Sequence, residues 1–429
     1  MNGARGFHPG GPARRGAMAW GYGALTLVSL LALAVRAEQP AGPARATDPV
    51  GATAMSPPSK LNSQATPATT AQPRGQYDNL INPSGYTSSR VCGTCHVDIY
   101  NSWKNSLHAF SLSDPVFDTA YMQAVKEAGD EARRLCLRCH APLTQANQDY
   151  DLKNDVTKEG VSCDFCHTLT AVHLDQPAQP FSMEPGLVKR SVLRKAVSPA
   201  HAVVFSELHQ SADLCGGCHN FVLPDGTLLM GTYDEWKQGP YARKGVPCQD
   251  CHMVRGAGKV VSADIKLTES GEINRHDLIH DTDQLRSALS ARVTTAERVP
   301  GGVMVRVQVE NVGSGHMVPT GIPSREIVLT VAVQAGGNIT SQDRHYRKVV
   351  ADKDGQVLSR DFEILLRGAK ILSDNRIAPR EQRIESFFFS APGSGAIKVT
   401  ATLSYRYSPL IVDQREINIE LATAERHVP

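Results

Sequence analysis

The cysteines and histidines of this 429-residue sequence form one repeated pattern with the spacing of a covalent cofactor site. All ten cysteines belong to Cys-x-x-Cys-His motifs, which occur five times between residues 92 and 252. In chain order, the five motifs are Cys92–Cys95–His96, Cys136–Cys139–His140, Cys163–Cys166–His167, Cys215–Cys218–His219 and Cys248–Cys251–His252. Two thiols at this spacing can form thioethers with the two vinyl groups of one porphyrin, and the following histidine can ligate its iron. The motif is therefore typical of haem c attachment.

Zinc and disulfides explain the pattern less well. A structural zinc ion takes four protein ligands, so Cys-x-x-Cys pairs come in twos and need no adjacent histidine. Here the number of motifs is odd and every motif has its histidine. A disulfide framework would not repeat one spacing five times and leave no cysteine outside it. The sequence thus predicts five covalently bound haem c groups, with the five motif histidines as proximal iron ligands.

The sixth ligand of each iron decides what such a protein does. A second histidine gives a low-spin iron suited to electron transfer, whereas an open place lets a substrate bind. The predicted distal ligands are His108, His201, His276, His316 and, with less support, His209. Weaker alternatives are Met230, Met253 and Met317. Because these candidates are sufficient for five irons, the histidine supply favours electron transfer.

Position in the chain distinguishes these histidines. His108 follows Trp103 by five residues in a predicted helical segment. A helix predicted over residues 205–214 would lie between His201 and His209, and His201, further from the fourth motif, can more easily reach a different haem. His276 and His280 are four residues apart and would share a helical face, which favours one ligand, His276.

His316 lies in a glycine-rich loop, residues 311–321, that leaves a predicted strand. Glycines permit the close backbone approach that a loop entering a haem pocket needs. A solvent-facing histidine in a tight loop is the alternative. His173 and His345 are predicted to be exposed.

A short segment occurs twice. Residues 103–109, WKNSLHA, resemble residues 236–242, WKQGPYA, with Tyr241 in the place of His108. The first copy follows a motif and the second precedes one. We interpret this as a reused helical unit whose histidine is a ligand in one copy only.

The chain divides into four predicted regions. Residues 1–37 resemble an export signal, because Arg14 and Arg15 precede an apolar run over residues 17–35 and Ala37 completes a cleavage site. The run is also long enough to remain as an N-terminal membrane anchor. Residues 38–76, rich in Ala, Pro and Thr, are predicted to be a disordered linker. Residues 77–284 form the predicted pentahaem cytochrome c domain, and residues 285–429 form the last region.

Period-two alternation of apolar residues marks this last region. It appears in residues 303–309, 327–333, 384–389, 397–407 and 417–421, with turn residues between them. The segment 352–355, DKDG, has too few ligands for a calcium loop and is expected to be a hairpin turn. The predicted fold class is therefore α+β, with a mainly helical multihaem domain followed by an antiparallel β-sandwich.

The formal net charge of +2 would change in the holoprotein. Five haems bring ten propionates, which add up to about −10 when ionised. The mature protein is thus expected to be acidic, and nothing in the sequence indicates nucleic-acid binding.

Four segments resemble a known family. They are the first motif with its flanking residues (90–96), the unit from Trp103 to Ala109, and the third and fifth motifs in residues 160–167 and 246–253. These are similar to multihaem cytochromes related to the tetrahaem electron carrier of ammonia oxidation. That group shares its haem packing with hydroxylamine oxidoreductase and pentahaem nitrite reductase. The resemblance covers about residues 86–285, and the segment Gly315–Gly321 is similar to one beside β-domains of larger relatives.

The resemblance implies stacked haem pairs, a mainly helical fold and, for most members, electron transfer. The tetrahaem type has four motifs and one five-coordinate haem, so the haem order is not transferable and an open iron is conceivable here. The nitrite reductases have a lysine in place of one motif histidine, which none of these five motifs has.

Three functions follow as hypotheses. The first is an exported electron carrier, periplasmic or extracellular, that serves redox partners such as other cytochromes or a quinol-oxidising membrane complex of a respiratory chain. The second is an oxidoreductase acting on a small nitrogen or sulfur compound at one open haem, with Tyr241 as a candidate lining residue. The third is a subunit of a conductive cytochrome polymer, in which oligomerisation would be essential.

Overall fold

The computed structural model describes residues 79–223, 225–262, 271–278, 281–391, 393–408 and 416–429. The predicted signal and linker lie outside these ranges, as does His280. All described residues fall in one compact unit, Ser63–Pro429. Among them, no helix is both long enough and apolar enough to cross a bilayer.

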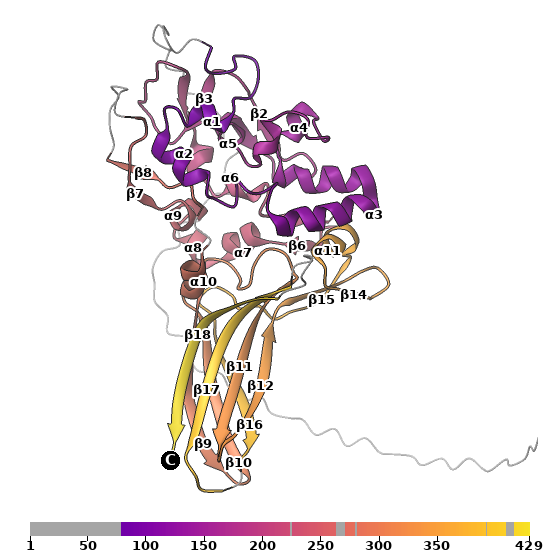
Figure 1. Ribbon diagram of the computed structural model, residues 1–429, viewed down its shortest axis with the longest axis vertical. Coiled ribbons are helices and arrows are strands. Elements are labelled where there is room, and N and C mark those ends of the chain that lie inside the picture. The colour runs from indigo at the N-terminus through magenta and orange to yellow at the C-terminus, as the bar shows by residue number, and fades with distance from the viewer. Residues whose placement is uncertain (1–78, 224, 263–270, 279–280, 392, 409–415) are drawn as a thin grey trace, which may run out of the picture. The chain divides into compact units, whose positions relative to one another are not determined.

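Each of the five motifs lies in a helix or begins in one (Figure 1). The helices are α1 (Ser89–Cys92), α2 (Val97–Trp103), α3 (Pro115–His140), α4 (Thr144–Asn147), α5 (Cys163–Thr168), α6 (Asp213–Gly216), α7 (Thr232–Gln238), α8 (Pro240–Arg243), α9 (Cys248–His252), α10 (Thr282–Ala288) and α11 (Asp361–Arg367), with 3-10 turns η2 (Thr157–Glu159) and η3 (Glu207–Gln210).

Four small two-stranded sheets lie between these helices. They pair β1 (Leu169–Val172) with β2 (Phe181–Met183), β3 (Val188–Ser191) with β4 (Ala202–Phe205), β5 (Phe221–Val222) with β6 (Leu228–Met230), and β7 (Arg255–Ala257) with β8 (Glu272–Asn274). The helix predicted over residues 205–214 is wrong, because this stretch contains the end of β4, η3 and α6 instead. The branched Val203 and Val204 pair with β3, and this tertiary pairing outweighs the local helical pattern.

Helix α3 is two helical pieces joined at Gly129, which has a φ of 54° and a ψ of −126°. Only glycine adopts this backbone conformation readily. The chain therefore folds back on itself, as Figure 1 shows, and brings the start of α3 beside its end. Ala124 and Ala132 are fully buried and pack with Phe362 of α11.

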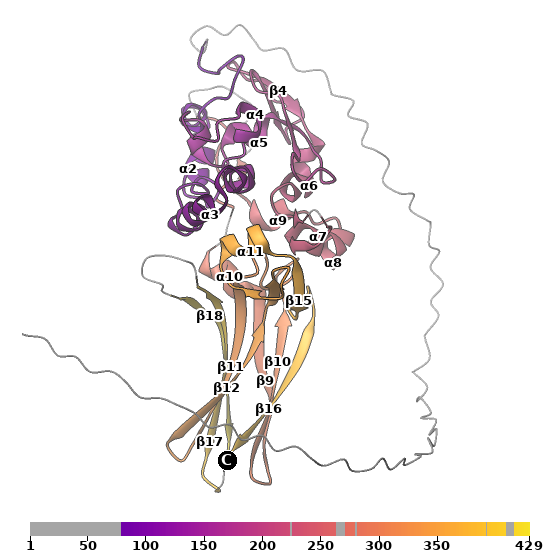
Figure 2. The same ribbon diagram turned by 90° about the vertical axis from the view of Figure 1, so that its right-hand side faces the viewer.

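The long strands form two antiparallel sheets, which Figure 2 shows as two layers. One has the order β16-β10-β9, with β16 (Gln382–Ser390), β10 (Gly302–Asn311) and β9 (Leu289–Val299). The other has the order β12-β11-β17-β18, with β12 (Asn338–Tyr346), β11 (Arg325–Ala335), β17 (Ile397–Tyr407) and β18 (Ile417–Val428). A third small sheet contains β14 (Val357–Leu358), β13 (Lys348–Ala351) and β15 (Lys370–Asp374).

One apolar core joins the two large sheets. Alternate residues of each strand face it, and the four alternating valines of β10, from Val303 to Val309, are completely buried. Ile327 to Val333 on β11 and Ile397 to Leu403 on β17 follow the same period. This combination of helices with antiparallel sheets agrees with the α+β prediction, and the expected turn at Gly355 joins β13 to β14.

Candidate haem-binding site

One large cavity contains every group that the sequence singles out for haem binding. Its volume is about 1340 Å³, more than the roughly 300–1,000 Å³ of an ordinary small-molecule pocket. All ten cysteines, the five motif histidines and the five predicted distal histidines line it. The ten cysteines are free thiols. The cavity thus has both the attachment chemistry and the iron ligands in one place.

Three of the five proximal histidines are held in one orientation by the backbone. Nδ1 of His96, His140 and His167 lies 2.6 Å from a carbonyl oxygen in each case, that of Val260, Ser111 and Arg190 respectively. A carbonyl can only accept, so Nδ1 carries the proton in these rings. Nε2 is then left as the lone-pair nitrogen, which is the arrangement found in metal-ligating histidines.

Four motif histidines have a second histidine opposite them. The ring centroids are 6.1 Å apart for His96 and His201, 6.3 Å for His219 and His108, 6.4 Å for His167 and His276, and 6.5 Å for His252 and His316.

This spacing is that of two imidazoles on one metal ion. Two nitrogen–metal bonds of about 2.0–2.1 Å each, plus the distance from ring centre to nitrogen on both sides, give a separation of roughly 6.3 Å. Direct ring stacking would bring the centroids closer. The residues therefore fit the iron of a haem at four of the five motifs.

The distal histidines also have the protonation that ligation needs. Nδ1 of His201, His276 and His316 donates to the carbonyl of Ala202, Asn274 and Met317 at 3.1, 2.7 and 2.9 Å. Burial lowers the pKa of His108 to about 3, and that of His201 and His276 to about 4. Burial lowers the pKa of His316 as well. All four imidazoles are thus neutral at physiological pH, which leaves a nitrogen lone pair for a metal.

His209 differs from the other candidates. Its ring lies 5.6 Å from that of His167, but its Nε2 donates to the carbonyl of Cys166 at 3.0 Å. Its Nδ1 is buried and has no hydrogen-bond partner among the described residues. Since His276 faces the same His167 at the spacing of a shared metal ion, the geometry favours His276 over His209 there.

His140 of the second motif faces a phenylalanine. The rings of Phe117 and His140 stack with centroids 3.7 Å apart. This contact follows from the reversal at Gly129, because Phe117 lies in the first turn of α3 and His140 ends it. No other described histidine pairs with His140, and Phe117 lies on the face of its ring and not opposite Nε2. The sequence analysis missed Phe117, since no local signal in the sequence predicts its position.

The comparisons with known proteins agree with this geometry. Residues 91–168 match the family described as cytochrome c554 and c-prime. The fold resembles that of a penta-haem cytochrome c552 from Thermochromatium tepidum, with a TM-score of 0.62 and 22% identity over 81% of this chain and 100% of that chain. The family match supports a multihaem c-type cytochrome with covalently bound haem, and the structural match shows the fold.

Other matches are much weaker. The CARDB domain of PF1109 from Pyrococcus furiosus has a TM-score of 0.18 and 15% identity, over 33% of this chain and 89% of that chain. A beta-glucosidase from Kluyveromyces marxianus has a TM-score of 0.16 and 11% identity, over 33% of this chain and 14% of that chain. Likenesses of this size carry no argument. No curated protein matches the chain by sequence.

The remaining candidate residues fall into two groups, one outside the cavity and one in its lining. His173 hydrogen-bonds Ser182 and His345 pairs with Glu326, both away from the cavity. Met230, Met253 and Met317 line the cavity. Tyr241 also lines it, and its ring lies against Gly315 and under the guanidinium of Arg380. Tyr241 is therefore a neighbour of the His316 loop.

Proposed function

We propose that this chain is an exported pentahaem c-type cytochrome that relays electrons between redox partners. The observation that carries the proposal is the set of four histidine pairs, each at the separation of two ligands on one iron. Haem c, when bound, supplies an iron that takes up and releases one electron, and two imidazole ligands suit both of its oxidation states. Backbone carbonyls hold five rings of that ligand set in one orientation: His96, His167, His201, His276 and His316.

In this proposal, the covalent attachment sites are the ten motif cysteines and the proximal ligands are the five motif histidines. His201, His276, His108 and His316 are the distal ligands of the first, third, fourth and fifth motifs. The match to a penta-haem cytochrome fold and the five motifs together support a count of five haems.

Contacts between cysteines of different motifs support a continuous series of sites. Cys92 of the first motif contacts Cys163 of the third, Cys139 of the second contacts Cys218 of the fourth, and Cys215 of the fourth contacts Cys248 of the fifth.

The third and fourth motifs are neighbours too. The pKa of Cys215 and of Cys218 is raised by their thiol partners, by burial and, to a smaller degree, by Cys166 of the third motif. The inferred order of sites is first, third, fourth, with the second and the fifth both adjoining the fourth. Electron transfer needs such close neighbours, and an isolated site would argue against a relay.

Coulometric titration of the holoprotein tests the relay. The proposal expects five electrons per chain, and oxidation of the reduced protein by an external acceptor that empties all five irons in one continuous process. Fewer than five electrons, or an iron that stays reduced while the others are oxidised, would contradict it.

The second motif favours a second candidate function. No described histidine lies opposite His140 at the spacing of a shared iron, so a small nitrogen or sulfur compound could bind at this iron and be oxidised or reduced there. The test is turnover of nitrite, hydroxylamine or sulfite by the holoprotein, with and without cyanide, which binds an open iron. Turnover that cyanide abolishes would favour the oxidoreductase, and no turnover would leave the carrier.

The periplasmic or extracellular location, the membrane anchor at residues 17–35 and the redox partners remain proposals based on the sequence. The relation to hydroxylamine oxidoreductase and pentahaem nitrite reductase and the conductive polymer remain predictions as well.

A further inference from the structure

Helices α2 and α7 are two copies of one local structure. In each, a tyrosine lies three residues before a tryptophan, and the ring centroids are 5.8 Å apart both for Tyr100 and Trp103 and for Tyr233 and Trp236. The lysine after each tryptophan lies over the tyrosine ring, at 6.0 and 5.4 Å. Each tyrosine N–H donates to the carbonyl of a proximal histidine, at 2.8 and 3.1 Å. The structural repeat thus begins three residues before the sequence repeat and ends soon after the tryptophans. The helix predicted at His108 is wrong, because His108 lies in turns beyond α2, whereas Tyr241 lies in α8.

Each tryptophan holds the backbone just before one Cys-x-x-Cys-His motif. The indole N–H of Trp103 donates to the carbonyl of Val161 at 2.9 Å, and that of Trp236 donates to the carbonyl of Val246, also at 2.9 Å. Both valines lie two residues before the first cysteine of a motif, the third and the fifth respectively. The two indoles therefore fix equivalent points on the proximal side of two different irons.

The residue before each tryptophan holds the distal side of the same iron. In α2 this residue is Ser102, whose hydroxyl accepts a hydrogen bond of 2.8 Å from the backbone N–H of His276. His276 faces His167 of the third motif, the motif that Trp103 anchors. Helix α2 thus contacts both the segment that leads to the proximal histidine and the distal histidine of the third-motif site.

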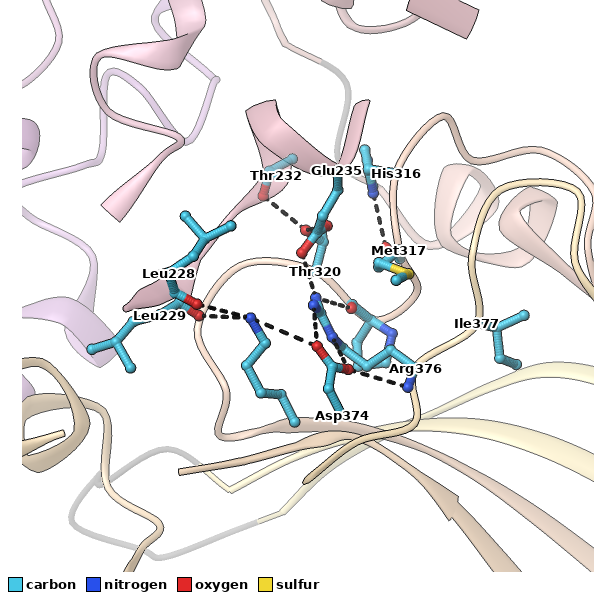
Figure 3. A network of polar contacts seen from close by, with 12 residues as sticks. Leu228, Leu229, Thr232, Glu235, His316, Met317, Thr320, Asp374, Arg376 and Ile377 are labelled. Carbon is cyan, nitrogen blue, oxygen red and sulfur yellow. Dashed lines mark hydrogen bonds and ion pairs between the residues drawn. The ribbon is translucent and has the colours of Figure 1, made fainter. Parts of the chain in front are cut away.

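In α7 the corresponding residue is Glu235 (Figure 3). Its carboxylate accepts from the hydroxyl of Thr320 at 2.8 Å and from the guanidinium of Arg376 at 2.7 Å. Arg376 also donates to the carbonyl of Pro319 at 3.2 Å. Residues 319 and 320 belong to the loop of His316, which faces His252 of the fifth motif. Glu235 therefore holds the distal loop of the site that Trp236 anchors.

We propose that α2 and α7 are two copies of a positioning device in which adjacent side chains fix the two axial ligands of one iron. Ser102 and Trp103 serve the third motif, and Glu235 and Trp236 serve the fifth. The inference goes beyond the proposed function and rests on its ligand assignments. Ser102 acts through one neutral hydrogen bond, whereas Glu235 acts through a buried ionic network, so the distal loop of the fifth motif is held more tightly.

Binding of carbon monoxide to the reduced holoprotein tests the distal half of the device. A distal histidine must dissociate before carbon monoxide can bind, so the rate reports how firmly that histidine is held. Glu235→Ala is expected to raise the rate of one iron at least tenfold, and Glu235→Gln by an intermediate factor. Ser102→Ala should accelerate a different iron by less than Glu235→Ala does.

Neighbouring residues provide matched controls. Asp234→Ala removes a carboxylate from the same helix, and Asn101→Ala shortens the residue beside Ser102; both should leave the rates unchanged. His316→Ala and His276→Ala identify the two irons, because each should convert one slow phase to a fast one. If they do not, the ligand assignments of the proposed function are wrong. If they do, but Glu235→Ala and Glu235→Gln keep the parent rate, the positioning device is refuted.

Electron paramagnetic resonance tests the proximal half. Trp236→Phe removes the N–H but keeps an aromatic ring, and should alter only the low-spin signal that His316→Ala abolishes. Trp103→Phe should alter only the signal that His276→Ala abolishes. Unchanged signals, or a change in the other iron's signal, would overturn the assignment of these tryptophans.

Discussion

Replacement of Arg376 by methionine should destabilise the folded holoprotein strongly. The Arg376 side chain is 6% exposed and the Glu235 side chain 7%, whereas Asp374 is 28% exposed. Without the guanidinium, water can reach Asp374, but Glu235 remains as a buried charge. Among the described residues its hydrogen-bond partner is then Thr320, and Lys348 acts on it through charge alone. Breaking a buried pair in this way costs about 3–5 kcal/mol, a factor of roughly 140 to 4,000 in the folding equilibrium.

The double variant Arg376→Met with Glu235→Leu separates charge from packing. Since it leaves no uncompensated carboxylate, it should recover most of the loss. Thr320 keeps a hydroxyl partner, because it also contacts Thr232 at 2.8 Å. The assay is urea unfolding of the holoproteins, followed by circular dichroism, for the parent, both single variants and the double variant. Single and double variants of equal stability would refute the reasoning, because the loss would then come from the missing arginine and not from the stranded carboxylate.

Three further predictions use other parts of the structure. Burial raises the pKa of Asp374, but the hydrogen bonds and charge of Arg376 outweigh it and hold this pKa below its ordinary value. The carboxylate therefore contributes stability that is present above the unfolded pKa and is lost as pH falls through the folded pKa. Asp374→Asn should flatten the dependence of the urea midpoint on pH below about 4, and parallel curves for parent and variant would contradict this. Leu329 is fully buried in the core between the two large sheets. Leu329→Ala should therefore lower the free energy of unfolding by about 2–5 kcal/mol, while the haem absorption spectrum stays that of the parent. An absorption spectrum of altered spin state would argue against the separation of this core from the haem sites. No described histidine faces His140 at the spacing of a shared iron, so the reduced parent protein should bind carbon monoxide fast at one iron, and His316→Ala should add a second fast phase. A parent protein without a fast phase would contradict an open iron at the second motif.

Spacing in the sequence predicts what is local. Period-two alternation identifies β10, β11, β16, β17 and β18, because one face of each strand is buried and the other is not. It missed β12, an edge strand of mostly polar residues, and β9, whose pairing with β10 shifts between Arg306 and Val307 and interrupts the alternation. A predicted helix at 205–214 failed because the valines before it pair with a distant strand.

In the candidate haem site, too, local features could be predicted from the sequence and long-range contacts could not. His316 could be singled out because glycines flank it, and the unit around Trp103 because it recurs at Trp236. Neither signal reveals the partner of each histidine, since the pairs join residues up to 111 positions apart, as for His108 and His219. Phe117 reaches His140 only because the chain reverses at Gly129, and Arg376 reaches Glu235 only because two sheets and a loop bring them together. Tertiary contacts of this kind leave no local periodicity.

The most direct test is the electron paramagnetic resonance spectrum of the oxidised protein, with haem content determined on the same sample. The account predicts five haems per chain, four of them low-spin with two histidine ligands and one high-spin at the second motif. Fewer than five haems, or more than one high-spin iron, would contradict the pairing of His201, His276, His108 and His316 with their motif histidines.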